Sequence, residues 1–358
     1  MEQSELLAVI ERAGQDGSPE LNLADQGIDH LPPEIGNLSH LYELDLQDNF
    51  LRTLPVEIGK LRSLTGLHLS ANDGLTVLPR EIFNLTSLRD LSLPGYDTAL
   101  PPEISNLTNL EELLIGPGPL KTLPPEIGDL LNLSTLNVWA TLLEKLPPEI
   151  GNLSNLKRLW LWNINFTPVD ALPSEIGRLR NLTSLFICGH KLTHLPPEIG
   201  DLCNLTELSL IGSGPAALPA EIGRLKKLEK LHIAGWNFTV LPPEIGELTN
   251  LKKLILINTP VRELPAEIGN LTELEELRIP SLPLETLPAE IGDLTNLKEL
   301  NIAGVPLKTL PAEIGKLSKL TKLTIRKADH QRLHTYIKQF PNLETLYFSP
   351  DPLRPTAN

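Results

Sequence analysis

The sequence predicts an α/β fold, a curved solenoid in which a parallel β-sheet lines the concave face of an arc and short helical or 3-10 segments cover the convex face. The main observation is a repeat, since Leu-Pro-x-Glu-Ile occurs thirteen times and nine of the twelve intervals are 23 residues. Composition agrees, because 41% of the 358 residues are hydrophobic but only 4% are aromatic, as thin aliphatic layers require. A stack grows in one dimension, so we expect a single domain over residues 1–358.

One repeat, Leu41 to Leu61, illustrates the predicted coil. Leu44 and Leu46 alternate with polar residues, which indicates a short strand with one buried face. Pro55 has no backbone N–H, so the strand ends before it and a short helical turn begins. Gly59 is expected to end that turn through dihedral angles that other residues avoid. A single unit cannot bury its own apolar faces, so the repeats must stack.

The two ends depart from the repeat and are expected to cap it. Glu5 to Arg12 has the apolar spacing of an amphipathic helix that would cover the first coil. Towards the other end, Asp329 to Gln339 replaces the repeat's helical segment, and we expect a longer helix there before the last of about fifteen strands. The predicted organisation is a capping helix in 1–19, repeats in 20–328, a C-terminal cap in 329–349 and a frayed tail in 350–358.

The repeat Leu-Pro-x-Glu-Ile-Gly-x-Leu, with its 23-residue period, resembles the Ras-group leucine-rich repeats over about residues 1–348. That group includes an animal scaffold that joins a Ras-type GTPase to a phosphatase, plant intracellular proteins and bacterial proteins. Residues 5–7 and 20–23 are similar to the start of bacterial members, some of which continue into a Ras-like GTPase module. The resemblance implies a protein-binding solenoid, with a Ras-like GTPase or its regulator as one candidate partner.

The sequence departs from that family at the ninth position of the repeat. Asn is usual there, and its side chain bonds backbone groups of adjacent turns, but only Asn49 and Asn72 fit. We therefore expect the asparagine ladder to be mostly absent and the turn after each strand to depart from the family's geometry. Trp236 occupies the ninth position of its coil and could turn inward.

The formal net charge of −14 says little about partners. Thirteen of the 45 acidic residues are the one Glu that recurs in the repeat, and the remaining charges are close to balanced. No basic stripe is apparent, which argues against nucleic-acid binding, and no apolar stretch approaches the roughly 20 residues of a membrane span. The acidic N-terminus does not resemble a signal peptide, and the only two cysteines provide no disulfide caps, so we expect a cytoplasmic protein.

No sequence motif indicates catalysis, and we expect no enzyme activity, no cofactor and no metal. The glycine-lysine pairs at residues 59–60 and 315–316 lack the rest of a phosphate-binding loop. The recurrent Glu is interpreted as a solvent-facing residue at a helix start. His330 and His334 have the spacing of a metal-binding pair, but no third ligand is apparent and a solvated helix face is the preferred interpretation.

The concave face is where the sequence predicts function. In the strand motif Leu-x-x-Leu-x-Leu-x, the third, fifth and seventh positions point outward and have no structural reason to be apolar. Apolar side chains nevertheless occupy them in the middle and later coils, which predicts a protein-binding patch, because Trp is enriched in binding hot spots and exposed apolar patches mark interfaces. Aromatic packing that only stabilises the sheet is the alternative. The candidate residues are Trp139, Trp160, Trp162, Phe186, Ile211, Ile255 and Ile257, with Arg158, Lys230 and Lys253 beside them.

Two further features accompany this patch. The single 26-residue interval places extra residues within 163–171, directly after Trp162, and predicts a loop beside the patch. Charge also changes along the face, and it would orient a partner of opposite polarity, although an unselected solvated surface explains it equally well. The outward acidic residues of early coils are Glu20, Glu43, Asp45, Asp90 and Glu112, and the outward basic residues of late coils are Lys230, Lys253, Arg278, Lys322 and Arg326, with Glu276 and Glu299 interspersed.

The sequence thus predicts a non-catalytic scaffold or adaptor that binds a protein partner on its concave face through an aromatic patch. One alternative is the sensor or regulatory domain of a larger signalling enzyme, such as a bacterial GTPase with leucine-rich repeats. Another is a bacterial effector that acts inside a host. Self-association through the concave face would also account for the patch.

Overall fold

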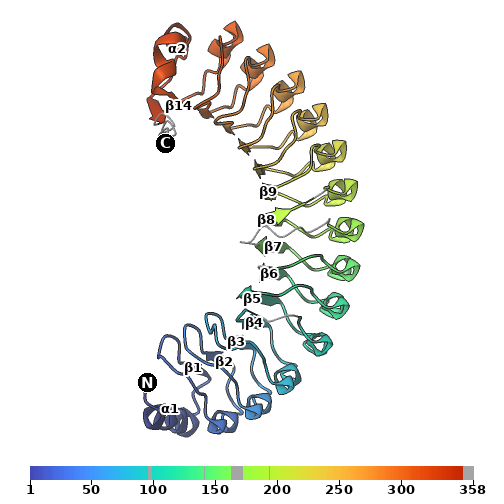
Figure 1. Ribbon diagram of the computed structural model, residues 1–358, viewed down its shortest axis with the longest axis vertical. Helices are drawn as coiled ribbons and strands as arrows, with labels where there is room; N and C mark the ends of the chain where they lie inside the picture. Colours follow the sequence, from blue (N-terminus) through green and yellow to red (C-terminus); the bar gives the residue numbers. More distant parts are fainter. Residues whose placement is uncertain (96–98, 141, 163–171, 193, 350–358) are drawn as a thin grey trace, which may run out of the picture. The chain divides into compact units, whose positions relative to one another are not determined.

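The computed structural model describes residues 1–95, 99–140, 142–162, 172–192 and 194–349. The chain divides into two compact units, Met1–Ser184 and Leu185–Asn358, and a single domain stays a prediction. In the described residues, fifteen parallel strands follow the order of the sequence, which confirms the predicted fold class. Within each unit the strands lie along one side and the 3-10 helices along the other (Figure 1).

The strands of the first unit pair with the strand of the next repeat in register at their buried leucines, and the β5–β6 pair shifts register between Ile115 and Gly118. Leu21 stands beside Leu44, Leu44 beside Leu67 and Leu67 beside Leu91, so each buried position continues as a row. These strands are β1 Glu20–Asn22, β2 Glu43–Asp45, β3 Gly66–His68, β4 Asp90–Leu93, β5 Glu112–Gly118, β6 Thr135–Ala140 and β7 Arg158–Trp162.

The same pairing continues in the second unit, where Leu231 stands beside Leu254 and Leu254 beside Leu277. The remaining strands are β8 Ser184–Lys191, β9 Glu207–Ser213, β10 Lys230–Ala234, β11 Lys253–Ile257, β12 Glu276–Arg278, β13 Glu299–Asn301, β14 Lys322–Arg326 and β15 Thr345–Ser349.

Each repeat also contributes a five-residue 3-10 helix that starts one residue after the first Pro of the motif. Pro55 itself is extended, with φ −68° and ψ 146°, and η2 buries Ile58. The helices are η1 Pro33–Asn37, η2 Val56–Lys60, η3 Arg80–Asn84, η4 Pro102–Asn106, η5 Pro125–Asp129, η6 Pro148–Asn152, η7 Ser174–Arg178, η8 Pro197–Asp201, η9 Ala220–Arg224, η10 Pro243–Glu247, η11 Ala266–Asn270, η12 Ala289–Asp293 and η13 Ala312–Lys316.

The repeated Gly of these 3-10 helices has a different role from the one expected. Gly59 lies inside η2 and does not adopt a positive φ, so the prediction that its dihedral angles end the turn is wrong. The reason for glycine is space. A Cβ on Gly59 would lie 2.7 Å from the Cβ of Glu81 and 2.8 Å from its carbonyl oxygen, in the next coil. Consecutive coils therefore approach too closely for a larger residue where this Gly occurs, while Phe83 and Ser105 occupy the position in η3 and η4.

Asparagine side chains join neighbouring coils at two different places. Asn49 donates to the carbonyl oxygens of Leu23 and Leu46 and accepts from the amides of Gln26 and Ile28, and Asn72 forms a similar set, as the ninth-position pattern implied. At the ninth position of later coils, residues such as Trp236 and Leu282 are buried instead.

A second asparagine ladder occupies the position before the first Leu of the strand motif, and the sequence analysis did not identify it. Each Nδ2 donates to a backbone carbonyl of the preceding coil at 2.7–2.8 Å. These residues are Asn109, Asn132, Asn155 and Asn181 in the first unit and Asn250, Asn296 and Asn342 in the second. In the early coils, asparagine thus joins neighbouring coils at the turn after the strand. In the later coils it joins them at the turn before the strand.

A helix lies at each of the two ends where a cap was predicted. Helix α1 spans Gln3–Asp16, is longer than expected, and buries Leu6, Ile10 and Ala13. It ends at Gly17, whose φ of 61° is the left-handed conformation typical of a helix end. At the other end η14 Lys327–Asp329 leads into α2 His330–Ile337. The predicted frayed tail, residues 350–358, lies outside the described residues.

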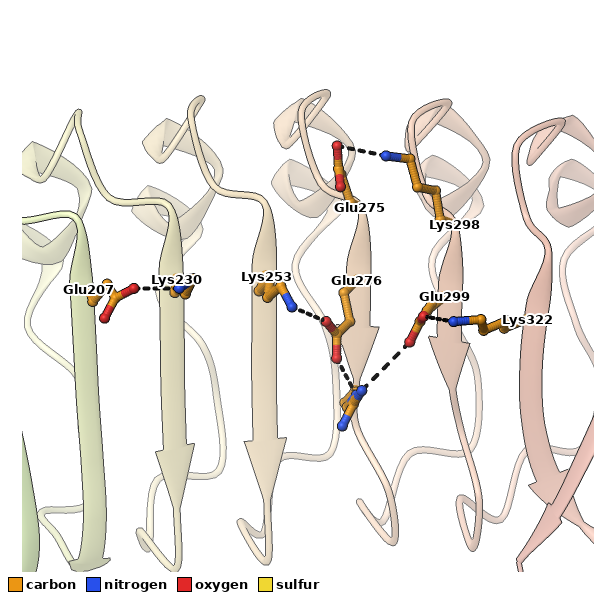
Figure 2. A network of polar contacts seen from close by, with 9 residues as sticks. Glu207, Lys230, Lys253, Glu275, Glu276, Lys298, Glu299 and Lys322 are labelled. Carbon is orange, nitrogen blue, oxygen red and sulfur yellow. Dashed lines mark hydrogen bonds and ion pairs between the residues drawn. The ribbon is translucent and has the colours of Figure 1, made fainter.

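Charged side chains form a network across β9 to β14 at the outward position that begins each strand (Figure 2). Along this row, Lys230 pairs with Glu207 of β9, and Lys253 pairs with the buried carboxylate of Glu276 at 2.8 Å. Arg278 bridges Glu276 and Glu299. Glu299 also pairs with Lys322 at 2.5 Å. Each side chain of this row that stands beside a like charge therefore also forms an ion pair with an opposite charge.

A Gly→Ala substitution at this contact between coils should destabilise the chain. A Cβ on Gly292 would lie 2.4 Å from the carbonyl oxygen of Glu313, so Gly292→Ala should lower the free energy of unfolding by about 1–3 kcal/mol through overpacking. Gly315→Ala is the matched control, because its Cβ would approach only the flexible side chain of Gln339, at 3.3 Å. Thermal unfolding followed by circular dichroism measures both, and equal losses would contradict the steric explanation.

The network should make stability depend on pH in the acid range. The hydrogen bond from Lys322 holds the pKa of Glu299 below its ordinary value of 4.5. A carboxylate with a lowered folded-state pKa stabilises the fold above its unfolded pKa, and that stability is lost as pH falls through the folded pKa. Glu299→Gln should therefore lower the free energy of unfolding by about 0.5–1 kcal/mol at pH 7. This difference should shrink progressively as the pH falls below 4.5.

The matched control for this experiment is Glu285→Gln. Glu285 also pairs with a lysine, Lys308, but both side chains are largely exposed and no second cation joins them. At pH 7, Glu285→Gln should lower the free energy of unfolding by less than Glu299→Gln does. A difference between wild type and Glu299→Gln that does not change between pH 7 and pH 3 would contradict the electrostatic account.

Candidate functional site

The outward side chains of the strands form what we call the strand face. Burial alternates along β7, where Leu159 and Leu161 are buried while Arg158, Trp160 and Trp162 are partly exposed. The same alternation occurs in β10, β11 and β14. The third, fifth and seventh positions of the strand motif therefore point outward, as predicted. We refer to them as the first, second and third rows of the strand face.

Three tryptophans lie on the strand face of the first unit. Trp139 and Trp162 stand beside each other in the third row, with ring centroids 5.1 Å apart and ring planes tilted by 33°. Trp160 lies in the second row and donates its indole N–H to Ser184 Oγ at 3.2 Å. Trp139 keeps 39% of its surface exposed. The packing between rings fixes their orientation, and the exposed area leaves them available for contact.

The other apolar candidates belong to the second unit. Phe186 is half-buried in β8. Ile211, Ala234 and Ile257 are neighbours in the third row, and Ile255 stands beside His232 in the second row. Burial lowers the pKa of His232 below its usual value, which favours the neutral imidazole. These strands therefore present half-buried aliphatic side chains beside a neutral histidine.

The three basic candidates are all engaged in ion pairs. Arg158 pairs with Glu112 at 3.0 Å, across the intervening strand, while Lys230 and Lys253 belong to the network of Figure 2. The basic residues of the later strands therefore do not form an unneutralised positive patch. A hydrogen bond from Lys230 to Glu207 raises the pKa of Lys230, as expected for a paired ammonium group.

A polar pocket on the strand face of the first unit was not predicted. It has a volume of about 420 Å³ and extends over β3 to β7, and its lining includes Asp90, Ser92, Thr135, Asn137 and Trp160. Burial raises the pKa of Asp90 above its ordinary value, the charge of His68 acts in the opposite direction, and Glu112 and Glu43 raise it further. Its small polar residues stand at outward positions among Glu112 and Leu114, so no pattern in the sequence indicated the pocket.

The loop expected within 163–171 lies outside the described residues. His330 and His334 lie on α2 with ring centroids 5.7 Å apart, and the described residues contain no group of three or more potential metal ligands. Cys188 and Cys203 are not joined by a disulfide. None of the described helices is both long enough and apolar enough to span a membrane.

Comparison with solved structures supports the same fold. A leucine-rich-repeat protein of Leptospira interrogans is 29% identical, with a TM-score of 0.67, and the match covers 94% of this chain and 98% of that one. The plant peptide hormone receptor RGFR1, solved in complex with RGF2, is 27% identical with a TM-score of 0.63, over 90% of this chain and 57% of the receptor chain.

An internalin from Listeria monocytogenes shares the fold alone, at 20% identity and a TM-score of 0.58, over 82% of this chain and 92% of that one. No curated protein matches the chain in sequence. A family model for a leucine-rich repeat region matches residues 20–118 and 198–283, more than half of the chain. The repeated coil, its parallel strands and this match lead to one conclusion: the chain belongs to the leucine-rich-repeat family.

Proposed function

We propose that this chain is a non-catalytic scaffold or adaptor, and that a protein partner docks on the strand face of its first unit. The observation that carries the proposal is the group of three tryptophans, Trp139, Trp160 and Trp162, at outward positions of β6 and β7. Nothing in a parallel sheet requires a large aromatic residue on the solvent side. Leucine-rich repeat regions are typically binding regions without catalytic activity of their own.

The geometry of the tryptophans favours binding over sheet stabilisation alone. Contact between Trp139 and Trp162 restricts both rings before any partner arrives, so little side-chain entropy remains to be lost on docking. Trp139 still exposes 39% of its surface, and burial of that apolar area would favour association. The hydrogen bond to Ser184 orients Trp160 in the adjacent row. A rigid, partly exposed aromatic cluster is a common form of binding hot spot.

One structural relative supports a recognition role, since the plant receptor RGFR1 was solved in complex with RGF2. A Ras-like GTPase or its regulator is a candidate partner only through the resemblance of the repeat to the Ras-group class. A sensor domain of a larger enzyme, a bacterial effector, self-association and a cytoplasmic location also stay predictions. So does a contribution of Phe186, Ile211, Ile255, Ile257 and the three basic residues to binding.

Removal of the tryptophans should weaken binding without unfolding the chain. The variant Trp139→Ala/Trp160→Ala/Trp162→Ala should lose at least about tenfold in affinity for a partner captured from lysate and then purified, because hot-spot truncations cost about 2 kcal/mol or more. Calorimetry with the purified partner measures the affinity, and light scattering shows whether the partner is a second copy of the chain.

Phe50→Ala is the matched control, because Phe50 is an aromatic residue that is 71% exposed but lies outside the strand face. This variant should bind as wild type does. Circular dichroism checks that both variants stay folded. Unchanged affinity and unchanged mass in the triple variant, together with a lower melting temperature, would assign the tryptophans to sheet packing and overturn the proposal.

A further inference from the structure

The polar pocket beside Trp160 contains buried polar atoms that have no protein partner. Among the described residues, Ser70 Oγ, Ser92 Oγ, Thr135 Oγ1 and Asn137 Oδ1 are buried and receive or donate no hydrogen bond, and all four side chains line this pocket. Ser92, Thr135 and Asn137 are only 6%, 8% and 9% exposed. Unsatisfied buried polar groups are costly in a folded protein, and several that line one pocket are suited to binding a polar ligand.

One carboxylate in the pocket also has no partner, although its acidic neighbours do. Glu43 pairs with His68, and the absence of a side chain at Gly66 provides the room for this pair. On the other side, Arg158 reaches across Thr135 to Glu112. Asp90 lies between these pairs in the first row. In the described part of the chain its carboxylate forms no hydrogen bond and no ion pair.

We propose that this pocket binds the guanidinium or ammonium group of an arginine or lysine side chain that the partner protein inserts. The inference rests on the proposed function and names the chemistry that the partner must present. Asp90 provides the charge complement, and Ser92, Thr135 and Asn137 provide oxygen atoms that accept hydrogen bonds from a polar cation. Trp160 adds an aromatic ring to the lining of the pocket, and a cation is attracted to the face of such a ring.

The charges around the pocket favour a cation over an anion. The acidic residues Glu43, Asp90 and Glu112 outnumber the cation Arg158, which is already paired with Glu112, and His68 is paired with Glu43. A volume of about 420 Å³ is within the range of ligand sites and accommodates a long basic side chain. Because Trp160 lies on the edge of this pocket and also among the tryptophans, a protein segment could fill the pocket and cover the tryptophans together.

Asp90 should therefore affect stability and binding in opposite directions. Burial and the neighbouring glutamates raise the pKa of Asp90, which means that its negative charge is unfavourable in the free protein. Removal of that charge by Asp90→Asn should leave the melting temperature unchanged or raise it. The same substitution should weaken cation binding, a combination typical of functional rather than structural residues.

The test uses the full chain and N-acetyl-arginine amide as the probe, with N-acetyl-citrulline amide as its neutral counterpart of equal shape. At constant ionic strength, the arginine probe should shift the indole N–H signal of Trp160 in an NMR titration, with a dissociation constant on the order of 1 mM. The citrulline probe should bind at least about tenfold more weakly, and Asp90→Asn should weaken the arginine probe by at least about tenfold. Glu20→Gln, a carboxylate in the same row outside the pocket, should change nothing.

Several results would overturn the inference. Equal binding of both probes, unchanged binding by Asp90→Asn, or a melting temperature several degrees lower in that variant would each contradict a cation site at Asp90. Ser92→Ala is a second variant, and it should also weaken the arginine probe. A partner that depends on the tryptophans but not on Asp90 would overturn the pocket assignment and leave the proposed function intact. In another outcome, the arginine probe needs Asp90 but the partner binds equally well without the tryptophans. That result would overturn docking on the strand face and leave a site for a small free cation.

Discussion

The close, regular contact between one coil and the next is the constraint on which the rest of the structure depends. The carbonyl oxygen of the repeated Glu lies where a side chain on the preceding coil's Gly would be, as Gly59 and Glu81 illustrate. The strands on the other side keep register with their neighbours at the buried leucines. No coil has a core of its own, so stability comes from each interface between neighbours.

Because paired strands are in register, the residues at one outward position of successive repeats form a row across the sheet. A charge at one position stands beside its counterpart in the next coil, and like charges must then find partners along or across the row, as Arg278 does between Glu276 and Glu299. The same geometry brings Trp139 against Trp162. It also leaves Asp90 without a partner, because its neighbours in the first row are Gly66 and Glu112. The nearby basic groups, His68 and Arg158, pair with Glu43 and Glu112 instead. The chemistry of the strand face is thus determined by individual residues at the outward positions of an otherwise uniform repeat.

The sequence predicted what the period determines and missed what depends on contacts between coils. The strand motif and the first proline placed the fifteen strands, the 3-10 helices and the outward positions correctly. Gly59 was misinterpreted because local conformation and lack of space both select glycine, and only the distance to Glu81 separates them. The second asparagine ladder was missed because Asn155 and its counterparts bond a backbone carbonyl, which leaves no pattern of paired residue types.

The pocket was missed for a related reason: Ser92, Thr135 and Asn137 are ordinary polar residues in the sequence, and only their burial without partners distinguishes them. The tryptophans, in contrast, were found from sequence because a large aromatic residue at an outward position is conspicuous in any repeat. Sequence therefore identified the exposed edge of the candidate site, while the buried part required the structure.

Docking of a protein on the strand face of the first unit is the central claim, and site-specific photocrosslinking to the captured partner tests it most directly. A photoreactive residue in place of Leu114, which lines the pocket, should crosslink the partner. The same group in place of Leu131, which is exposed and lies outside the strands, should not. Crosslinking from position 131 but not from position 114 would contradict the account.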